Sequence, residues 1–208
     1  MALTKNKISE IIQDLKSANQ TNSTMKYDKR VIWEVADMAL SYLMSKLFWT
    51  IRKEGSYSFN NEFITTYKAK VKHDTVRELR YINLPARLIS LPDDRGLIQV
   101  SPMMNDGEQW VRVNVASNAV YSGLEAGKLS GKTGYRIEGQ KIYFQNLKPQ
   151  YNGSDVLVKM IASTENLGED APLPIPSDFE AEFLQMVIQF FNESKMTPQD
   201  KTVDNIAN

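Results

Sequence analysis

The chain has 208 residues, with 25 lysines and arginines against 25 aspartates and glutamates, one histidine and no cysteine. A sequence without cysteine excludes disulfides, thiolate metal sites, iron–sulfur clusters and cysteine nucleophiles. A single histidine excludes a histidine-rich zinc site, and a net charge of zero gives no bulk attraction to nucleic acid or to anionic membranes. The length predicts one domain, or one domain with extensions.

No segment has the pattern of a signal peptide or of a membrane span. The first 15 residues lack an uninterrupted apolar stretch. The most apolar run, residues 31–48, contains Glu34, Asp37 and Lys46. We therefore expect a protein that works without a membrane, in a compartment where thiols are reduced or irrelevant.

The N-terminal residues predict a short amphipathic helix. Apolar residues recur at helical spacing from Ile8 to Leu15, and Thr4 is placed to cap the helix. Residues 17–23 are small and polar, which predicts a loop.

A second, longer helix is predicted over residues 27–53. Asp28 suits its first turn, and Gly55 lies just beyond its end. Its apolar side chains cover most of the helix circumference. This distribution is typical of a helix that is central in a core or shared with a neighbouring subunit.

The middle of the chain predicts short β-strands. β-branched and aromatic residues indicate strands over residues 63–71, 80–83, 97–100, 110–115, 135–137, 141–144 and 155–162. His73 and Asp74 are expected near a turn, and Gly139 is expected to supply the positive φ of a hairpin turn. Strands with turn signals about every 8–12 residues predict an antiparallel sandwich or barrel.

The C-terminal part returns to helix. Prolines between residues 171 and 176 predict an extended strap, and Ser177 with Glu180 has the pattern of a capping box at the start of a helix. From residue 195 the sequence is polar and predicts a tail without a core of its own.

The domains expected are a helical part over 1–55, a β domain over 56–170, a strap with a helix that rejoins the helical part over 171–194, and an extended tail over 195–208. The predicted fold class is α+β. Helices from both chain ends are packed together, with a central antiparallel β-sandwich or barrel-like domain inserted between them.

Two motifs suggest chemistry but lack its requirements. The glycine-rich segment 127–133 has three residues between its glycines, where a phosphate-binding loop needs four, and it leads into a hairpin instead of a helix. His73 beside Asp74 suggests part of a catalytic triad, but neighbours in sequence do not orient an imidazole, and no G-x-S-x-G elbow is present. We interpret the first as a loop and His73 as a turn or strand-end residue.

Charged side chains are unevenly distributed. Six carboxylates and no basic residue lie between Glu165 and Glu182, a run without the spacing of a calcium-binding loop. Lys68, Lys70 and Lys72 alternate with Ala69 and Val71, so we expect the lysines on one face of a strand. That face is either simply solvated or contacts nucleic acid or an acidic partner.

Aromatic residues on the predicted helices exceed what two helices of a small domain easily bury. They are either part of a helix–sheet core or part of a subunit interface, where aromatic residues are enriched. The candidates for the interface are Trp33, Tyr42, Phe48, Trp49, Phe183, Phe190 and Phe191.

The order of the parts, together with three short motifs, resembles a known family. The motifs are Leu84-Pro85-x5-Leu91-Pro92-Asp93-Asp94-x-Gly96, the hairpin from Tyr135 to Phe144, and the proline segment from Pro172 to Pro176 followed by an acidic helix. In these features the chain resembles the head–tail connector proteins of short-tailed bacteriophages, also described as adaptor or tail-tubular-protein-A-like ring proteins. It is most similar in character to the ring proteins of crAss-like phages.

The resemblance implies a virion structural protein that is located at the portal vertex, or neck, of the virion, and in the host cytoplasm before assembly. It implies no enzymatic activity and no cofactor. Such subunits form a ring, commonly twelve-fold, beneath the portal protein and join it to further ring or tail proteins. They extend the channel through which DNA passes, with transient, non-specific DNA contact and no membrane.

The resemblance also implies roles for parts of this chain. Residues 32–51 and 179–191 would form the ring-packing helices, and the tail from residue 195 would dock onto the portal protein. The docking candidates in that tail are Met196, Pro198, Val203 and Ile206.

Three alternatives remain open. The chain is a different phage tail, baseplate or capsid-decoration protein whose β domain binds protein or glycan, for which trimers or hexamers are expected. It is an enzyme that uses carboxylates alone, such as a glycan hydrolase in which Glu138 or Glu108 faces a second acid. It is an unrelated cellular α+β domain.

Overall fold

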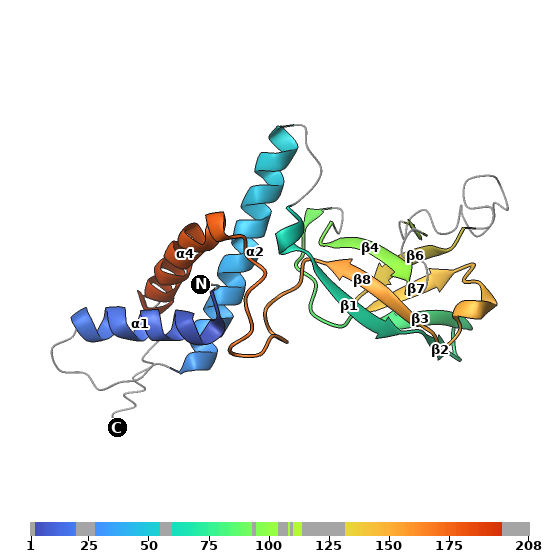
Figure 1. Ribbon diagram of the computed structural model, residues 1–208, viewed down its shortest axis with the longest axis horizontal. Coiled ribbons are helices and arrows are strands. Elements are labelled where there is room, and N and C mark those ends of the chain that lie inside the picture. Colours follow the sequence, from blue (N-terminus) through green and yellow to red (C-terminus); the bar gives the residue numbers. More distant parts are fainter. Residues whose placement is uncertain are drawn as a thin grey trace, which may run out of the picture. The chain divides into compact units, whose positions relative to one another are not determined.

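The computed structural model describes residues 3–19, 28–54, 60–92, 95–103, 108, 110–113 and 132–196. The chain divides into two compact units. The helical unit comprises Met1–Thr50 and Thr164–Asn208, and the β unit comprises Ile51–Ser163. The described residues form three α-helices and two β-sheets, so the α+β class is confirmed (Figure 1).

The helical unit combines both ends of the chain. Its helices are α1 (Lys5–Asn19), α2 (Lys29–Lys53) and α4 (Ser177–Met196), and the division between the units falls in the last turn of α2. The strap between the β unit and α4 belongs to this unit from Thr164 onward, which is earlier than the predicted boundary at residue 171.

The N-termini of α1 and α2 are capped by side chains. The backbone N–H of Lys7 donates to Thr4 Oγ1 at 3.2 Å, as the sequence predicted. Asp28 Oδ1 accepts from the backbone N–H of Arg30 at 2.9 Å. Asp28 is therefore an N-cap immediately before α2 and does not lie in its first turn.

The predicted capping box of α4 does not form. Ser177 Oγ donates to Asp178 Oδ1 at 3.2 Å, and Glu180 Oε1 accepts from the backbone N–H of Leu3 at 3.1 Å. Glu180 thus binds the N-terminal segment instead of reaching back to its own helix start. The competing donor comes from a residue far away in the sequence, which local spacing does not reveal.

The helices contact one another through side chains, and no pair of them is in close backbone contact along its length in the described residues. Large side chains lie between the backbones, as where Tyr42 of α2 meets Phe190 of α4. The directly packed set of helices predicted from the sequence is therefore not the arrangement observed.

The β unit contains two sheets. The strands are β1 (Thr65–Lys70), β2 (Lys72–Asp74), β3 (Leu79–Asn83), β4 (Leu97–Pro102), β5 (Val111–Arg112), β6 (Gly134–Glu138), β7 (Lys141–Gln145) and β8 (Asp155–Met160). One sheet has the order β1–β8–β4 and is antiparallel. The other has the order β2–β3–β7–β6–β5, in which β5 and β6 are parallel, so the prediction of purely antiparallel pairing was wrong for this pair.

Of two turns predicted from the sequence, the one at Gly139 is confirmed, and the one near His73 begins later than expected. Gly139 has a φ of +58° in the two-residue turn between β6 and β7, as predicted. His73 and Asp74 lie in strand β2, and the turn follows at residues 75–78. Asp74 ends the strand because its Oδ1 accepts from the backbone N–H groups of Val76 and Arg77 within that turn.

A continuous hydrophobic core lies within the β unit. Both sheets contribute, with Ile82, Ile142 and Phe144 from one and Val156 and Val158 from the other. The core also contains the buried aromatic residues Trp110, Tyr135 and Tyr151. No helix in the described part of the chain is long and apolar enough to cross a bilayer.

Candidate interaction surfaces

α2 carries an apolar stripe that its own chain leaves exposed. The exposed fractions are 45% for Val31, 62% for Met38, 55% for Tyr42 and 50% for Trp49. These residues are separated by seven, four and seven positions. At about 100° of turn per residue, the four positions fall within an arc of about 40° on one side of the helix. We call these four residues the α2 stripe; at about 1.5 Å per residue it is about 27 Å long.

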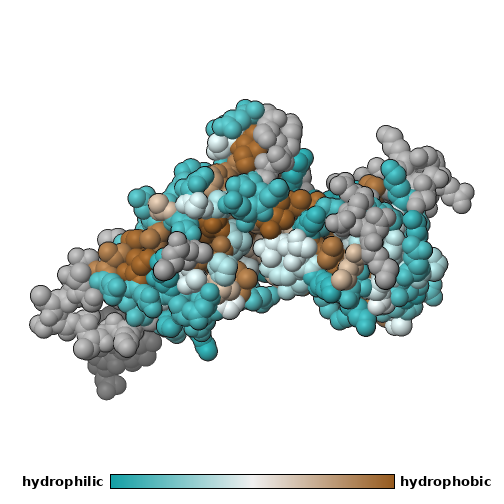
Figure 2. Space-filling model, viewed as in Figure 1, coloured by the Kyte–Doolittle hydropathy of each residue, from teal (hydrophilic) through white to brown (hydrophobic). Residues whose placement is uncertain are grey.

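α4 adds to this surface. The ring of Tyr42 packs edge-to-face against Phe190, with ring centres 5.6 Å apart. Lys46 and Glu182 form a second link between the same helices, an ion pair at 2.7 Å. Figure 2 shows hydrophobic surface, in brown, over α4 and over the C-terminal end of α2. Through the contact of Tyr42 with Phe190, the α2 stripe adjoins apolar side chains of α4.

Three of the seven predicted interface aromatics are buried within the chain itself. Phe48, Phe183 and Phe191 have exposed fractions of 8%, 0% and 2%. Of the two alternatives, core or subunit interface, their burial corresponds to the core, because these side chains lie in the interior of the helical unit. The exposed members are Tyr42 and Trp49, and Phe190 is half-buried.

Trp33 serves a contact inside the helical unit. Its Nε1–H donates to Ser9 Oγ at 3.1 Å, and Lys5 Nζ lies 5.4 Å from the centre of its ring. Val31 and Met38 were missed as surface candidates, because attention to aromatic residues alone passes over them. The signal in the sequence is the helical spacing of seven, four and seven positions that joins Val31 and Met38 to Tyr42 and Trp49.

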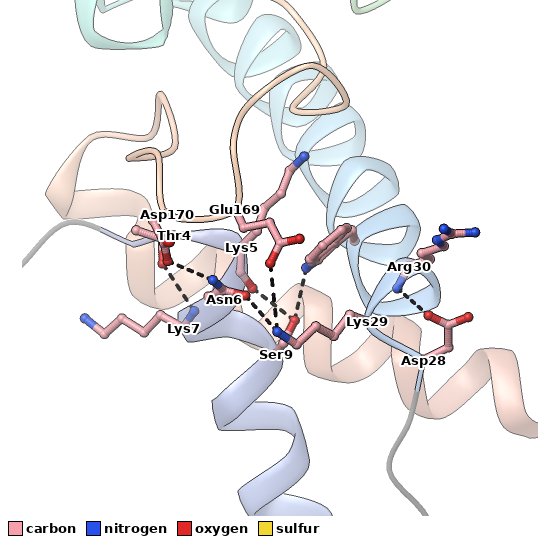
Figure 3. Close-up of polar contacts among 11 residues, drawn as sticks. Thr4, Lys5, Asn6, Lys7, Ser9, Asp28, Lys29, Arg30, Glu169 and Asp170 are labelled. Atoms are coloured by element: carbon pink, nitrogen blue, oxygen red, sulfur yellow. Dashed lines mark hydrogen bonds and ion pairs between the residues drawn. The ribbon is translucent and has the colours of Figure 1, made fainter.

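Lys5 and Asn6 belong to a polar cluster that joins the two chain ends; Figure 3 draws the contacts of Asn6 with Asp170 and of Lys29 with Asn6 and Glu169. The side chain of Lys5 is buried, and its Nζ donates to the backbone carbonyls of Leu167 at 3.0 Å and Glu165 at 3.4 Å. Asn6 lies beside it: its Nδ2 donates to Asp170 Oδ1 at 2.7 Å, and its backbone N–H donates to the carbonyl of Glu169 at 3.1 Å. These contacts fasten α1 to the start of the strap.

α2 takes part in the same fastening. Lys29 Nζ donates to Asn6 Oδ1 at 3.1 Å and lies 3.9 Å from a carboxylate oxygen of Glu169. Further along the helix, Asp37 Oδ1 accepts from both the backbone N–H and the hydroxyl of Thr164, at 2.8 and 2.6 Å. We call this set of contacts the clasp; it holds both chain ends in one unit.

The predicted lysine face is divided between the two sheets. Lys68 and Lys70 are exposed on β1, while Ala69 turns toward the core. Val71 is buried and interrupts the strand, so the exposed Lys72 begins β2 in the other sheet. Lys159 of β8, which the sequence reasoning did not single out, lies opposite Thr66 and joins the face of Lys68 and Lys70.

The two glutamates considered for catalysis are held by cations or hydroxyl donors. Arg136 Nε donates to Glu138 Oε1 at 2.6 Å and Arg77 pairs with the other oxygen, and these hydrogen bonds hold the pKa of Glu138 below its ordinary value. The Tyr151 hydroxyl donates to Glu108 at 2.8 Å and, with Lys148, lowers the pKa of Glu108. A catalytic acid needs the opposite shift.

Two other candidate sites have no supporting geometry. Asp74 accepts from the Tyr143 hydroxyl at 3.2 Å and from the turn backbone, not from His73, which is exposed and paired with Arg80 across β2 and β3. In the part of the chain that the structure describes, no three potential ligands are placed to hold a metal ion.

Two predictions lie outside the described residues. The glycine-rich segment 127–133 is described only at residues 132 and 133. Among the tail candidates, Met196 is the last residue of α4, and Pro198, Val203 and Ile206 are not described.

The surfaces that remain are therefore the α2 stripe on the helical unit and the lysines of β1 and β8 on the β unit. Both are suited to binding a macromolecule: the first is apolar, and the second is cationic. No protein-family model matches this chain, and no curated protein is significantly similar to it in sequence.

Proposed function

We propose that this protein is a virion structural protein, a subunit of the head–tail connector ring that lies beneath the portal protein of a short-tailed bacteriophage. In that role it extends the DNA channel and joins the portal to the tail, without catalysis or a cofactor. The two sheets form a sandwich, and the helical unit builds the wall of the ring.

The observation that carries this proposal is the α2 stripe. Met38, Tyr42 and Trp49 are each at least half exposed on one helix face. Fully burying such a side chain contributes about 1.5–3 kcal/mol, and tyrosine, tryptophan and methionine are enriched in the cores of protein interfaces. Leaving them in water therefore favours an assembly that covers them.

The clasp supports the same role. A ring subunit must keep its shape while it contacts neighbours above, below and beside it. In this chain, Lys5, Lys29 and Asp37 join both chain ends into one unit before any partner binds. The motif order described from the sequence supplies the remaining support, since it resembles that of connector proteins.

The test is the oligomeric state of the purified chain, alone and with the portal protein, measured by light scattering and by electron microscopy along the symmetry axis. We expect closed rings, about twelve-fold. A double substitution in the stripe, Met38→Glu with Trp49→Glu, should leave the chain folded and monomeric. Ser41→Glu, at an exposed position of the same helix outside the stripe, is the matched control and should assemble.

Two results contradict the proposal. If the wild-type chain stays monomeric with the portal protein present, it does not form the proposed ring. Trimers or hexamers favour a different tail, baseplate or capsid-decoration protein. If the stripe variant and the Ser41 control assemble equally well, the α2 stripe does not supply the subunit contact.

A further inference from the structure

The outer face of the β1–β8–β4 sheet carries three lysines close together. Lys68 and Lys70 are successive outward residues of β1, about 7 Å apart along the strand. Lys159 of β8 lies opposite Thr66 and is therefore a diagonal neighbour of Lys68, at about 7–8 Å. We call Lys68, Lys70 and Lys159 the lysine face.

These ammonium groups are not neutralised within the described part of the chain. None of the three forms an ion pair there, and the carboxylate in register, Asp155 opposite Lys70, is not within ion-pair distance of it. Like charges about 7–8 Å apart lie within the Debye length of physiological salt, so they repel one another. An anionic partner would relieve that repulsion.

Protection of the sheet edge explains only part of this pattern. Lysines on an edge strand discourage unwanted strand pairing, and β1 is an edge strand of its sheet. Lys159 lies on β8, the central strand, where no edge needs protection. The three positions share a face of the sheet and not an edge.

The helical unit carries the complementary charge. Between Glu165 and Glu182 the chain has six acids and no lysine or arginine. Four of these carboxylates are engaged within the helical unit: Glu169 and Glu182 pair with Lys29 and Lys46, and Asp170 and Glu180 accept from Asn6 and from the backbone N–H of Leu3. The other two, Glu165 and Asp178, are exposed, and neither carboxylate forms an ion pair in the described residues. We call residues 165–182 the acidic strap. It lies in the other unit of the chain from the lysine face.

We propose that the lysine face of one subunit binds the acidic strap of the next copy of the same chain. This inference rests on the proposed ring. A ring closes through heterologous contacts, in which two different surfaces of one chain meet. One cationic and one anionic surface in separate units provide such a non-identical pair, and their charges fix the direction of the contact.

A DNA backbone is the competing anion, and the chain favours the acidic strap over it. The whole sequence has no net positive charge to attract a polyanion. Within the face itself, Leu157 and Asp155 lie opposite Lys68 and Lys70. An apolar side chain and a carboxylate among the lysines suit a protein surface better than a continuous phosphate backbone.

The test exchanges the charges. One variant carries Lys68→Glu and Lys70→Glu, and a second carries Glu165→Lys and Asp178→Lys. Lys72→Glu, exposed but in the other sheet, and Glu10→Lys, exposed on α1, are the matched controls. Circular dichroism checks folding, and sedimentation velocity at low and high salt measures assembly.

We expect each charge-exchanged variant to associate about tenfold or more weakly than wild type, since two exposed pairs are replaced by repulsion. The controls should assemble normally. An equimolar mixture of the two variants should recover rings, because the acidic face of the first then meets the basic strap of the second. High salt should weaken wild-type rings, because it screens the attraction between the two surfaces, and should partly restore the association of each charge-exchanged variant, because it screens the repulsion.

The unfavourable outcomes are distinct. If wild-type rings form and the lysine variant forms them equally well, the inference is wrong and the ring proposal stands. If the lysine variant loses binding to a short labelled DNA duplex while its assembly is unchanged, the face binds nucleic acid and the inference is wrong. If the wild-type chain forms no ring with the portal protein, both proposals are wrong.

Discussion

Lys5 shows how a single buried charge can organise two distant parts of the chain. Burying an ammonium group is costly unless its N–H groups are satisfied. Here the carbonyls of Glu165 and Leu167 accept from it, and the ring of Trp33 lies 5.4 Å away. The hydrogen bonds from this one α1 side chain therefore fix the position of the strap at Glu165 and Leu167.

Replacing Lys5 with methionine tests this role. Lys5→Met keeps most of the side-chain volume but leaves the two strap carbonyls without their donor. An unsatisfied buried polar group costs about 1–3 kcal/mol, so the free energy of unfolding should fall by about that amount. Urea denaturation measures it. Arg30→Met, at an exposed position of α2, should change stability by less than about 0.5 kcal/mol; equal losses in both variants would contradict the role of Lys5.

Glu138 makes the stability of the β unit depend on pH. Its hydrogen bonds from Arg136 and Arg77 lower its pKa in the folded state. A lowered folded pKa means that the stabilisation is fully present above the unfolded value of about 4.3 and is lost as the pH falls through the folded pKa.

We therefore expect Glu138→Gln to destabilise the protein by about 1 kcal/mol at neutral pH, since it removes the charged acceptor of two arginines. At about pH 3 the difference from wild type should shrink, because the stabilisation from a lowered folded pKa is progressively lost below the unfolded value of about 4.3. Urea midpoints at both pH values measure this. A difference that grows on acidification would contradict the assigned pKa direction.

At the scale of elements, local patterns predicted where most helices and strands lie. The helical spacing after Thr4 and the long apolar run after Asp28 correspond to α1 and α2. The glycine turn at Gly139 fixed the β6–β7 hairpin. Each of these signals is contained within a few residues, so the sequence displays it directly.

The features that the sequence did not predict depend on residues far away in the chain. The acceptor role of Glu180 is set by Leu3, and the parallel pairing of β5 with β6 is set by chain topology. Likewise, sequence alone did not distinguish the buried Phe183 from the exposed Tyr42, because both lie on helices that are apolar over much of their circumference. Only the packing of the helical unit decides which face remains in water.

At the scale of the whole molecule, the two units differ in how the chain builds them. The β unit is one continuous segment, Ile51–Ser163, and its core residues from Val71 to Ala162 all lie within it. The helical unit needs both chain ends, since the clasp joins Lys5 to Leu167 and Asp37 to Thr164. A continuous segment with its own core is the usual condition for independent folding.

We therefore predict that a fragment of residues 51–163 folds alone, with a β-type circular dichroism spectrum and one cooperative urea transition. A fragment of residues 1–50 should not unfold cooperatively, because the strap and α4 that cover its apolar residues are missing. Adding residues 164–208 in trans should raise its helical signal. A 51–163 fragment without a cooperative transition would mean that the β unit depends on the helical unit for stability, and that the sheets fold only in the complete chain.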